Sequence, residues 1–149
     1  MSMVPHTYAE WVVILEAFKN KTNDEDTLNA MKAGTIEWQS GVAERFINKL
    51  TEAFNSRMNT ACDRFQKEMS RSNGQESLIV QAILGLRKEM AFLARAIDIP
   101  ALPENSRQQY VNLIVEQADN MQKSLEDSAK RDRTGKMSSI IRNHKVNSF

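Results

Sequence analysis

The sequence has few of the residues that build compact catalytic or metal sites. Its 149 residues include one cysteine, Cys62, and two histidines, His6 and His144, which lie near opposite ends of the chain. A single cysteine excludes an intramolecular disulfide, and zinc sites need closely spaced His and Cys ligands that the sequence lacks. The five scattered glycines form neither a Walker A motif nor a Gly-x-Gly-x-x-Gly motif. We therefore predict no metal site, no cofactor, no small-molecule substrate and no enzymatic activity.

Turn-forming residues are also scarce, with 5 glycines and 3 prolines in the whole chain. A fold of many short strands needs more turn formers than this, whereas long helices need few. Helix-favouring Ala, Leu, Glu, Lys, Arg, Gln and Met are abundant. Composition alone therefore favours an all-α fold.

Long apolar runs are missing as well. The longest apolar stretch, residues 78–86, is interrupted by Gln81 and has about half the length of a membrane span. The amino-terminal residues lack the basic region and the apolar run of a signal peptide. These patterns predict a cytoplasmic protein with no membrane partner.

What is present is helical periodicity, and residues 41–69 show it most clearly. Seven apolar residues recur there at intervals of three or four, within an arc of roughly 80° on a helical wheel. They are Ala43, Ile47, Leu50, Phe54, Met58, Ala61 and Phe65. Such a stripe needs other helices to pack on it, so this segment is expected to be the central helix of a bundle.

Four other segments have helical patterns. Residues 75–97 and 104–131 predict two further long helices, separated by a proline-containing linker. Near the amino terminus, residues 7–19 and 24–32 predict a short pair, of which the first begins with a capping box formed by Thr7 and Glu10. The predicted fold class is therefore all-α, an antiparallel helical bundle of three long helices plus a short N-terminal helical pair.

Two glycines carry expectations about local packing. Gly34 follows the second short helix, where a glycine commonly ends a helix in the left-handed conformation. Gly85 lies inside a predicted long helix, where it costs about 1 kcal/mol relative to alanine. We expect Gly85 to mark a close helix crossing.

Charge is distributed unevenly between the body of the chain and its end. The net charge is +1, yet residues 130–149 contain six basic residues and one acid, so that the preceding residues carry −4. Helical periodicity also weakens after residue 131. The sequence therefore predicts a helical bundle domain over residues 1–131 and a basic, weakly structured C-terminal tail over residues 132–149. A small apolar cluster in this tail, Met137, Ile140 and Ile141, could dock on a partner, on a second copy or on the bundle itself.

The leading functional interpretation is a non-enzymatic protein that acts by protein–protein interaction or self-association. The predicted helices have more apolar surface than one small bundle requires, and surplus apolar surface marks contact sites. Five residues on these wider apolar faces are the predicted partner-binding site: Trp38, Val42, Phe46, Val80 and Leu84.

The alternative interpretation is a nucleic-acid-binding accessory protein. Phosphate binding requires Lys and Arg side chains gathered on one surface. The candidates are basic residues on the polar face of the central helix and in the tail: Arg57, Arg64, Lys67, Arg71, Lys130, Arg131, Arg133, Lys136, Arg142 and Lys145. The near-zero net charge does not favour this alternative.

Overall fold

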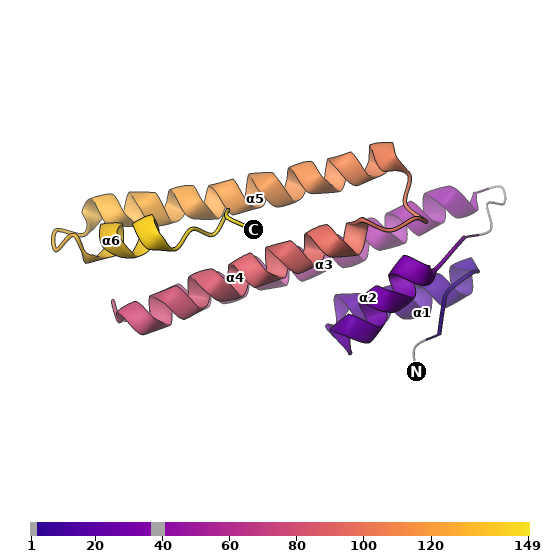
Figure 1. Ribbon diagram of the computed structural model, residues 1–149, viewed down its shortest axis with the longest axis horizontal. Helices are drawn as coiled ribbons and strands as arrows, with labels where there is room; N and C mark the ends of the chain where they lie inside the picture. Colours follow the sequence, from indigo (N-terminus) through magenta and orange to yellow (C-terminus); the bar gives the residue numbers. More distant parts are fainter. Residues whose placement is uncertain (1–2, 37–40) are drawn as a thin grey trace. The chain divides into compact units, whose positions relative to one another are not determined.

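The computed structural model describes residues 3–36 and 41–149, and in these ranges all regular secondary structure is helical (Figure 1). The helices are α1 (Tyr8–Lys19), α2 (Asp24–Ala33), α3 (Val42–Arg71), α4 (Glu76–Ile97), α5 (Glu104–Arg131) and α6 (Lys136–Asn143). The predicted all-α helical bundle is thereby confirmed. None of the helices in the described ranges combines the length and the apolar composition needed to cross a bilayer.

The chain divides into two compact units, and each of the three long helices contributes to both. Unit 1 contains residues 1–58 and 93–110, and unit 2 contains residues 59–92 and 111–149. The two units divide within the long helices, at residues 58/59, 92/93 and 110/111, and not at residue 131. The predicted domain boundary at residue 131 therefore stays a prediction.

Aromatic side chains form much of the core of unit 1. Trp11 of α1 and Phe46 of α3 are fully buried and meet edge to face, with ring centroids 4.9 Å apart. Phe54 of α3 and Tyr110 of α5 form a second such pair at 5.1 Å. Aromatic pairs in this geometry add to the stabilisation that burial provides. The amino-terminal half of α3 therefore contacts α1 on one side and the start of α5 on another.

The predicted capping box of α1 is confirmed. The backbone N–H of Glu10 donates to the Thr7 hydroxyl at 3.2 Å, and the Thr7 N–H donates to the Glu10 carboxylate at 3.1 Å. The N–H of His6 donates to the same carboxylate at 3.1 Å. These bonds from the His6 and Thr7 backbone lower the pKa of Glu10. They satisfy donors that the first turn of a helix leaves without partners.

A short extended segment after α2 holds the amino terminus. The Thr35 N–H donates to the Pro5 carbonyl at 3.0 Å, and the Trp11 indole N–H donates to the Thr35 carbonyl at 2.6 Å. Gly34 directly follows the last residue of α2, as predicted, but with φ −70° its backbone is extended and not left-handed. A glycine is required at position 34 because a larger residue would collide with its neighbours. A Cβ there would lie 2.6 Å from Cζ2 of Trp11 and 2.9 Å from Cγ of Pro5.

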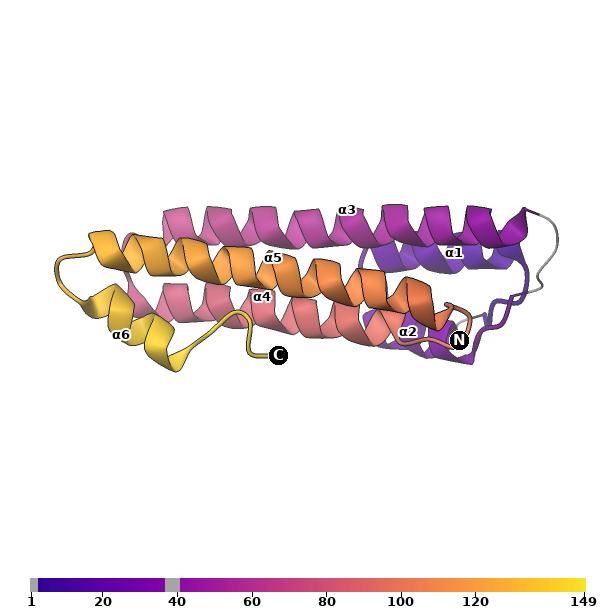
Figure 2. The same ribbon diagram turned by 90° about the horizontal axis from the view of Figure 1, so that it is seen from above.

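Unit 2 is built from the remaining parts of α3, α4 and α5, together with α6. In Figures 1 and 2, α6 lies alongside α5, to which residues 132–135 connect it. Met137, Ile140 and Ile141 of α6 are buried, as is Val146 beyond it. Residues 136–143 are thus helical, whereas the sequence indicated weak structure for the tail. Residues 136–143 form a helix because Met137, Ile140 and Ile141, spaced three and four apart, lie on one helical face and pack against unit 2.

Candidate protein-contact surface

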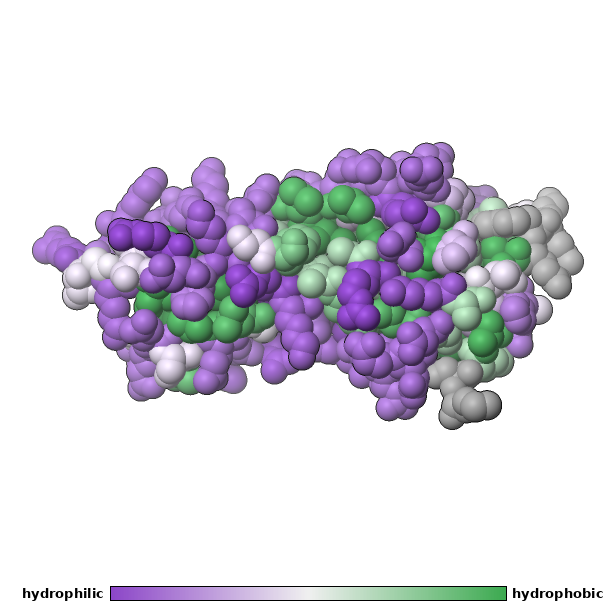
Figure 3. All heavy atoms as spheres, viewed as in Figure 1, coloured by the Kyte–Doolittle hydropathy of each residue, from purple (hydrophilic) through white to green (hydrophobic). Residues whose placement is uncertain are grey.

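The first half of α4 has an exposed face without charge. No charged residue occurs between Glu76 and Arg87, although several positions in that interval are exposed. Leu78 and Leu84 are each 38% exposed, and Val80 is half-buried. In Figure 3 hydrophobic surface lies over this part of α4. We call the exposed and half-buried residues of this interval the uncharged α4 face: Ser77, Leu78, Val80, Gln81, Leu84 and Gly85.

Gly85 lies in the middle of this face, next to Leu84. A Cβ placed on Gly85 would have no neighbouring heavy atom of the described residues within 4 Å. The prediction that Gly85 marks a close crossing inside the protein is therefore wrong. The glycine instead leaves the α4 backbone open to solvent.

The four described residues of the predicted partner-binding site do not form one exposed surface. Trp38 lies outside the described residues. Val42 and Phe46 are buried in unit 1, where Phe46 packs on Trp11. Their apolar faces are therefore used within the unit and are not surfaces for a partner. Of these four described residues, Val80 and Leu84 alone lie where a partner could contact them, on the uncharged α4 face.

Sequence reasoning missed two residues of this surface, Leu78 and Gly85. Leu78 begins the longest apolar stretch of the sequence, and the helical pattern around Gly85 predicts an internal crossing. The available signal was the absence of charge from ten consecutive residues in an otherwise charged helix. Unit 2 also exposes 46% of Val115 on α5.

Arg57 differs most from its predicted position. It was expected on an exposed polar face, but its side chain is only 1% exposed. It donates to both carboxylate oxygens of Asp24, at 2.9 and 2.7 Å, and to the Phe18 carbonyl at 2.9 Å. The expectation of an exposed Arg57 is wrong, because its position continues the core stripe of Leu50 and Phe54 at helical spacing.

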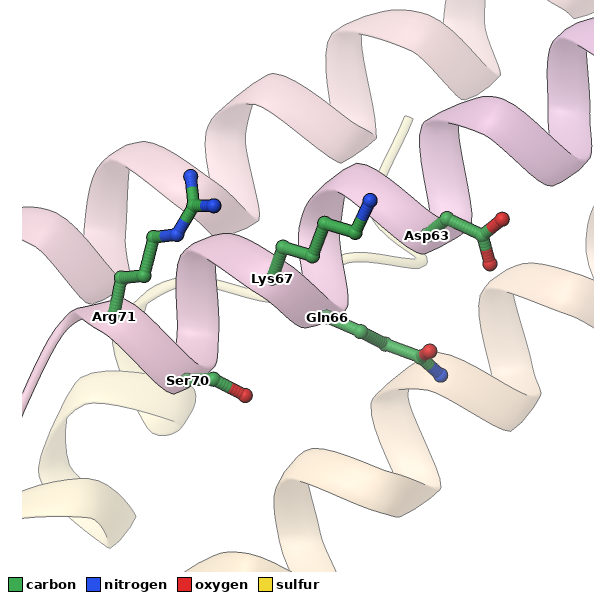
Figure 4. Close-up of a pocket in the computed structure, with 5 residues that line it drawn as sticks. All are labelled: Asp63, Gln66, Lys67, Ser70 and Arg71. Atoms are coloured by element: carbon green, nitrogen blue, oxygen red, sulfur yellow. The ribbon is translucent and has the colours of Figure 1, made fainter.

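The other three predicted basic residues of α3, Arg64, Lys67 and Arg71, are exposed and lie near its end. Arg64 pairs with Glu68 at 2.8 Å. A hollow of about 280 Å³ follows the last turns of the helix (Figure 4). Its lining residues all belong to α3: Asp63, Gln66, Lys67, Ser70 and Arg71. Exposed side chains of one helix, including an acid, surround this hollow, so it does not enclose a ligand.

The predicted basic residues of the C-terminal part are all exposed. They are Lys130, Arg131, Arg133, Lys136, Arg142 and Lys145. Asp132, the acid among them, accepts hydrogen bonds from the Thr134 N–H, the Thr134 hydroxyl and the Met137 N–H. Unit 2 as a whole has 12 Lys and Arg against 9 Asp and Glu, and is the more basic of the two units.

The side chains that could act as nucleophile or metal ligand are not grouped into a site among the described residues. Burial raises the pKa of the half-buried Cys62 thiol, and the charge of Asp63 raises it further. A raised pKa keeps the thiol protonated, which disfavours nucleophilic attack. Among the described residues, no three His, Cys, Asp or Glu side chains are grouped to hold a metal ion.

Comparison of the chain with protein-family models, with curated proteins and with solved structures finds no match.

Proposed function

We propose that this protein is a non-enzymatic binding module that contacts another protein, or a second copy of itself, through the uncharged α4 face. The observation that carries this proposal is the absence of charge from residues 77–86 where Leu78 and Leu84 reach solvent. Charged residues are depleted from the centres of protein interfaces, because burying an unpaired charge is costly.

Gly85 supports the same proposal. A glycine within a helix is destabilising, and here the surrounding fold does not require it. An exposed glycine beside Leu84 lets a partner's backbone or side chain approach α4 closely. The surface thus combines an apolar side chain with a site of close approach.

The experiment compares two glutamate substitutions at exposed apolar positions. Leu84→Glu places a charge on the uncharged α4 face, whereas Val13→Glu places one on α1, where Val13 is 60% exposed. Light scattering after size exclusion then measures the mass over a series of concentrations. We expect Leu84→Glu alone to lower the mass or, for a monomeric wild type, to abolish complex formation with an isolated partner. Equal behaviour of the two variants would contradict the proposal.

A second candidate function is binding to nucleic acid through unit 2. The observation that favours it is the series of six exposed cations between residues 130 and 145, where the acid Asp132 is engaged in local hydrogen bonds. Phosphate binding of this type weakens with salt, with a slope of about −0.9 per neutralised phosphate for duplex DNA.

Filter binding over a range of salt concentrations tests this candidate. Lys136→Glu with Arg142→Glu should weaken binding and flatten its salt dependence. Lys21→Glu with Lys32→Glu, two exposed positions in unit 1, changes the net charge equally and is the matched control. Binding that does not respond to salt would exclude the electrostatic mechanism.

A further inference from the structure

Residues 136–147, here called the docked segment, pack on the parts of α4 and α5 that belong to unit 2. We call the surface that they cover, which includes Arg87, Asp119 and Gln122, the seat. Its apolar contribution comes from Met137, Ile140, Ile141 and Val146, all of which are buried. An isolated helix of eight residues is unstable in water, so α6 depends on this packing for its structure. The segment must therefore be seated somewhere to remain helical.

Polar contacts fix the position of the docked segment beyond α6. The Val146 N–H donates at 3.0 Å to the side-chain oxygen of Gln122, which is buried in α5. The Asn147 amide donates to Asp119 at 3.1 Å, and Arg87 of α4 donates to the Lys145 carbonyl at 3.4 Å. The buried Gln122 fixes the position of the docked segment along α5, because a displaced segment would leave the Gln122 side-chain oxygen without this hydrogen bond.

The connection between α5 and the docked segment is short and lies at the surface. Residues 133–135 are all exposed. The reversal of the chain depends on Gly135, with φ 75°, and on the hydrogen bonds that Asp132 accepts from Thr134 and Met137. Residues 133–135 themselves contribute nothing to the core. When the docked segment leaves its seat, the connection therefore loses local hydrogen bonds, such as those that Asp132 accepts, and no core contacts.

We propose that the docked segment is exchangeable, and that two copies of this chain assemble by each placing its docked segment in the other's seat. The seat fits this sequence, so a segment from a second copy makes the same apolar contacts and the same bond to Gln122. Closed and exchanged forms then differ only in the connection and in the entropy of association, which is the condition for domain swapping. This inference uses a different surface from the uncharged α4 face and does not rest on it.

A disulfide between two different chains tests the exchange. One chain carries Asp119→Cys and the other Asn147→Cys, both with Cys62→Ser, and the two are mixed, unfolded, refolded together and oxidised. Both positions are exposed, and their native side chains lie 3.1 Å apart. The closed form keeps the two cysteines on separate molecules, whereas exchange brings them together. We expect a disulfide-linked heterodimer whose yield increases with protein concentration.

The control mixes Asn147→Cys with Val13→Cys, which measures random surface disulfides. A yield no higher than in this control would overturn the proposal. The same pair in a Leu84→Glu background should give an unchanged yield, so failure of exchange and failure of the proposed α4 contact are distinguishable.

Deletion of residues 133–135 provides a second test. The shortened connection cannot reverse the chain, so the docked segment can reach only the seat of another copy. We expect a doubling of the mass measured by light scattering, with the helix content retained. A folded monomer would contradict the proposal, and if the deletion variant does not fold, the disulfide experiment decides.

Discussion

Arg57 and Asp24 form a bidentate ion pair that joins α3 to the first turn of α2. The two guanidinium–carboxylate distances are 2.9 and 2.7 Å, and the Arg57 side chain is almost completely buried. The same guanidinium caps the end of α1 by donating to the Phe18 carbonyl, and it lies 5.1 Å from the centre of the Phe18 ring. One side chain thus holds the N-terminal helical pair on α3.

Asp24→Asn should destabilise the protein by about 3 kcal/mol, since it removes the carboxylate that pairs with the buried Arg57 guanidinium. Urea denaturation followed by circular dichroism measures the loss. Asp26→Asn, an exposed acid in the same turn of α2, is the control for the helix dipole and should change stability by less than about 1 kcal/mol.

The double variant Asp24→Asn with Arg57→Met distinguishes the contribution of the ion pair to stability from the contribution of the packing of the Arg57 side chain. It should be more stable than Asp24→Asn alone, because methionine occupies similar space and carries no charge to bury. A double variant less stable than the single one would show that Arg57 contributes mainly through the Phe18 contacts.

Substitution of two glycines by alanine should have opposite effects. Gly34→Ala should destabilise by about 1–3 kcal/mol, because the new methyl group collides with Trp11 and Pro5. Gly85→Ala should stabilise by up to about 1 kcal/mol, because it improves helix propensity where space is open. Denaturant midpoints of the two variants measure these changes, and a shift of equal sign would be inconsistent with the described packing.

The connection before α6 should respond to acid. Hydrogen bonds from the Met137 N–H and from Thr134 lower the pKa of the Asp132 carboxyl below its ordinary value. The stabilisation is therefore complete above the unfolded pKa of about 3.9. It is lost as the pH falls through the lower folded value.

Hydrogen exchange of the α6 amides over the acid range measures this dependence. Asp132→Asn should increase exchange at neutral pH and remove this acid transition. Asp127→Asn, an exposed acid on α5, is the control. An unchanged transition in Asp132→Asn would assign the acid response to another group.

Sequence periodicity predicted the helices well because their stripes are strong and local. The stripe from Leu50 to Phe65 and the capping box of Thr7 and Glu10 involve residues close in the chain. Such patterns express helical geometry directly. The long helices α3, α4 and α5 were all predicted on this basis.

The errors concern contacts between distant residues. Arg57 was assigned to the surface by its charge, although its position three residues after Phe54 placed it in the core stripe. Its partner Asp24 lies 33 residues away, and periodicity does not report such pairs. Gly34 and Gly85 show the same difficulty, because the space around a glycine depends on the tertiary structure.

The candidate surface was predicted only in part. Val80 and Leu84 were selected from surplus apolar character, and both lie on the uncharged α4 face. Phe46 and Val42 were selected by the same criterion and are buried. Apolar surplus alone does not separate a surface that meets another helix of the same chain from one that meets a partner.

Site-specific photo-cross-linking in cells that produce the protein tests directly whether the uncharged α4 face binds a protein. A photoreactive amino acid replaces Leu84 in one variant and Val13, the more exposed control, in another. We expect a covalent adduct at position 84, with the cross-linked protein or second copy identified by mass spectrometry, and none above background at position 13. No adduct at position 84, or equal adducts at both positions, would contradict the claim that the uncharged α4 face binds a protein.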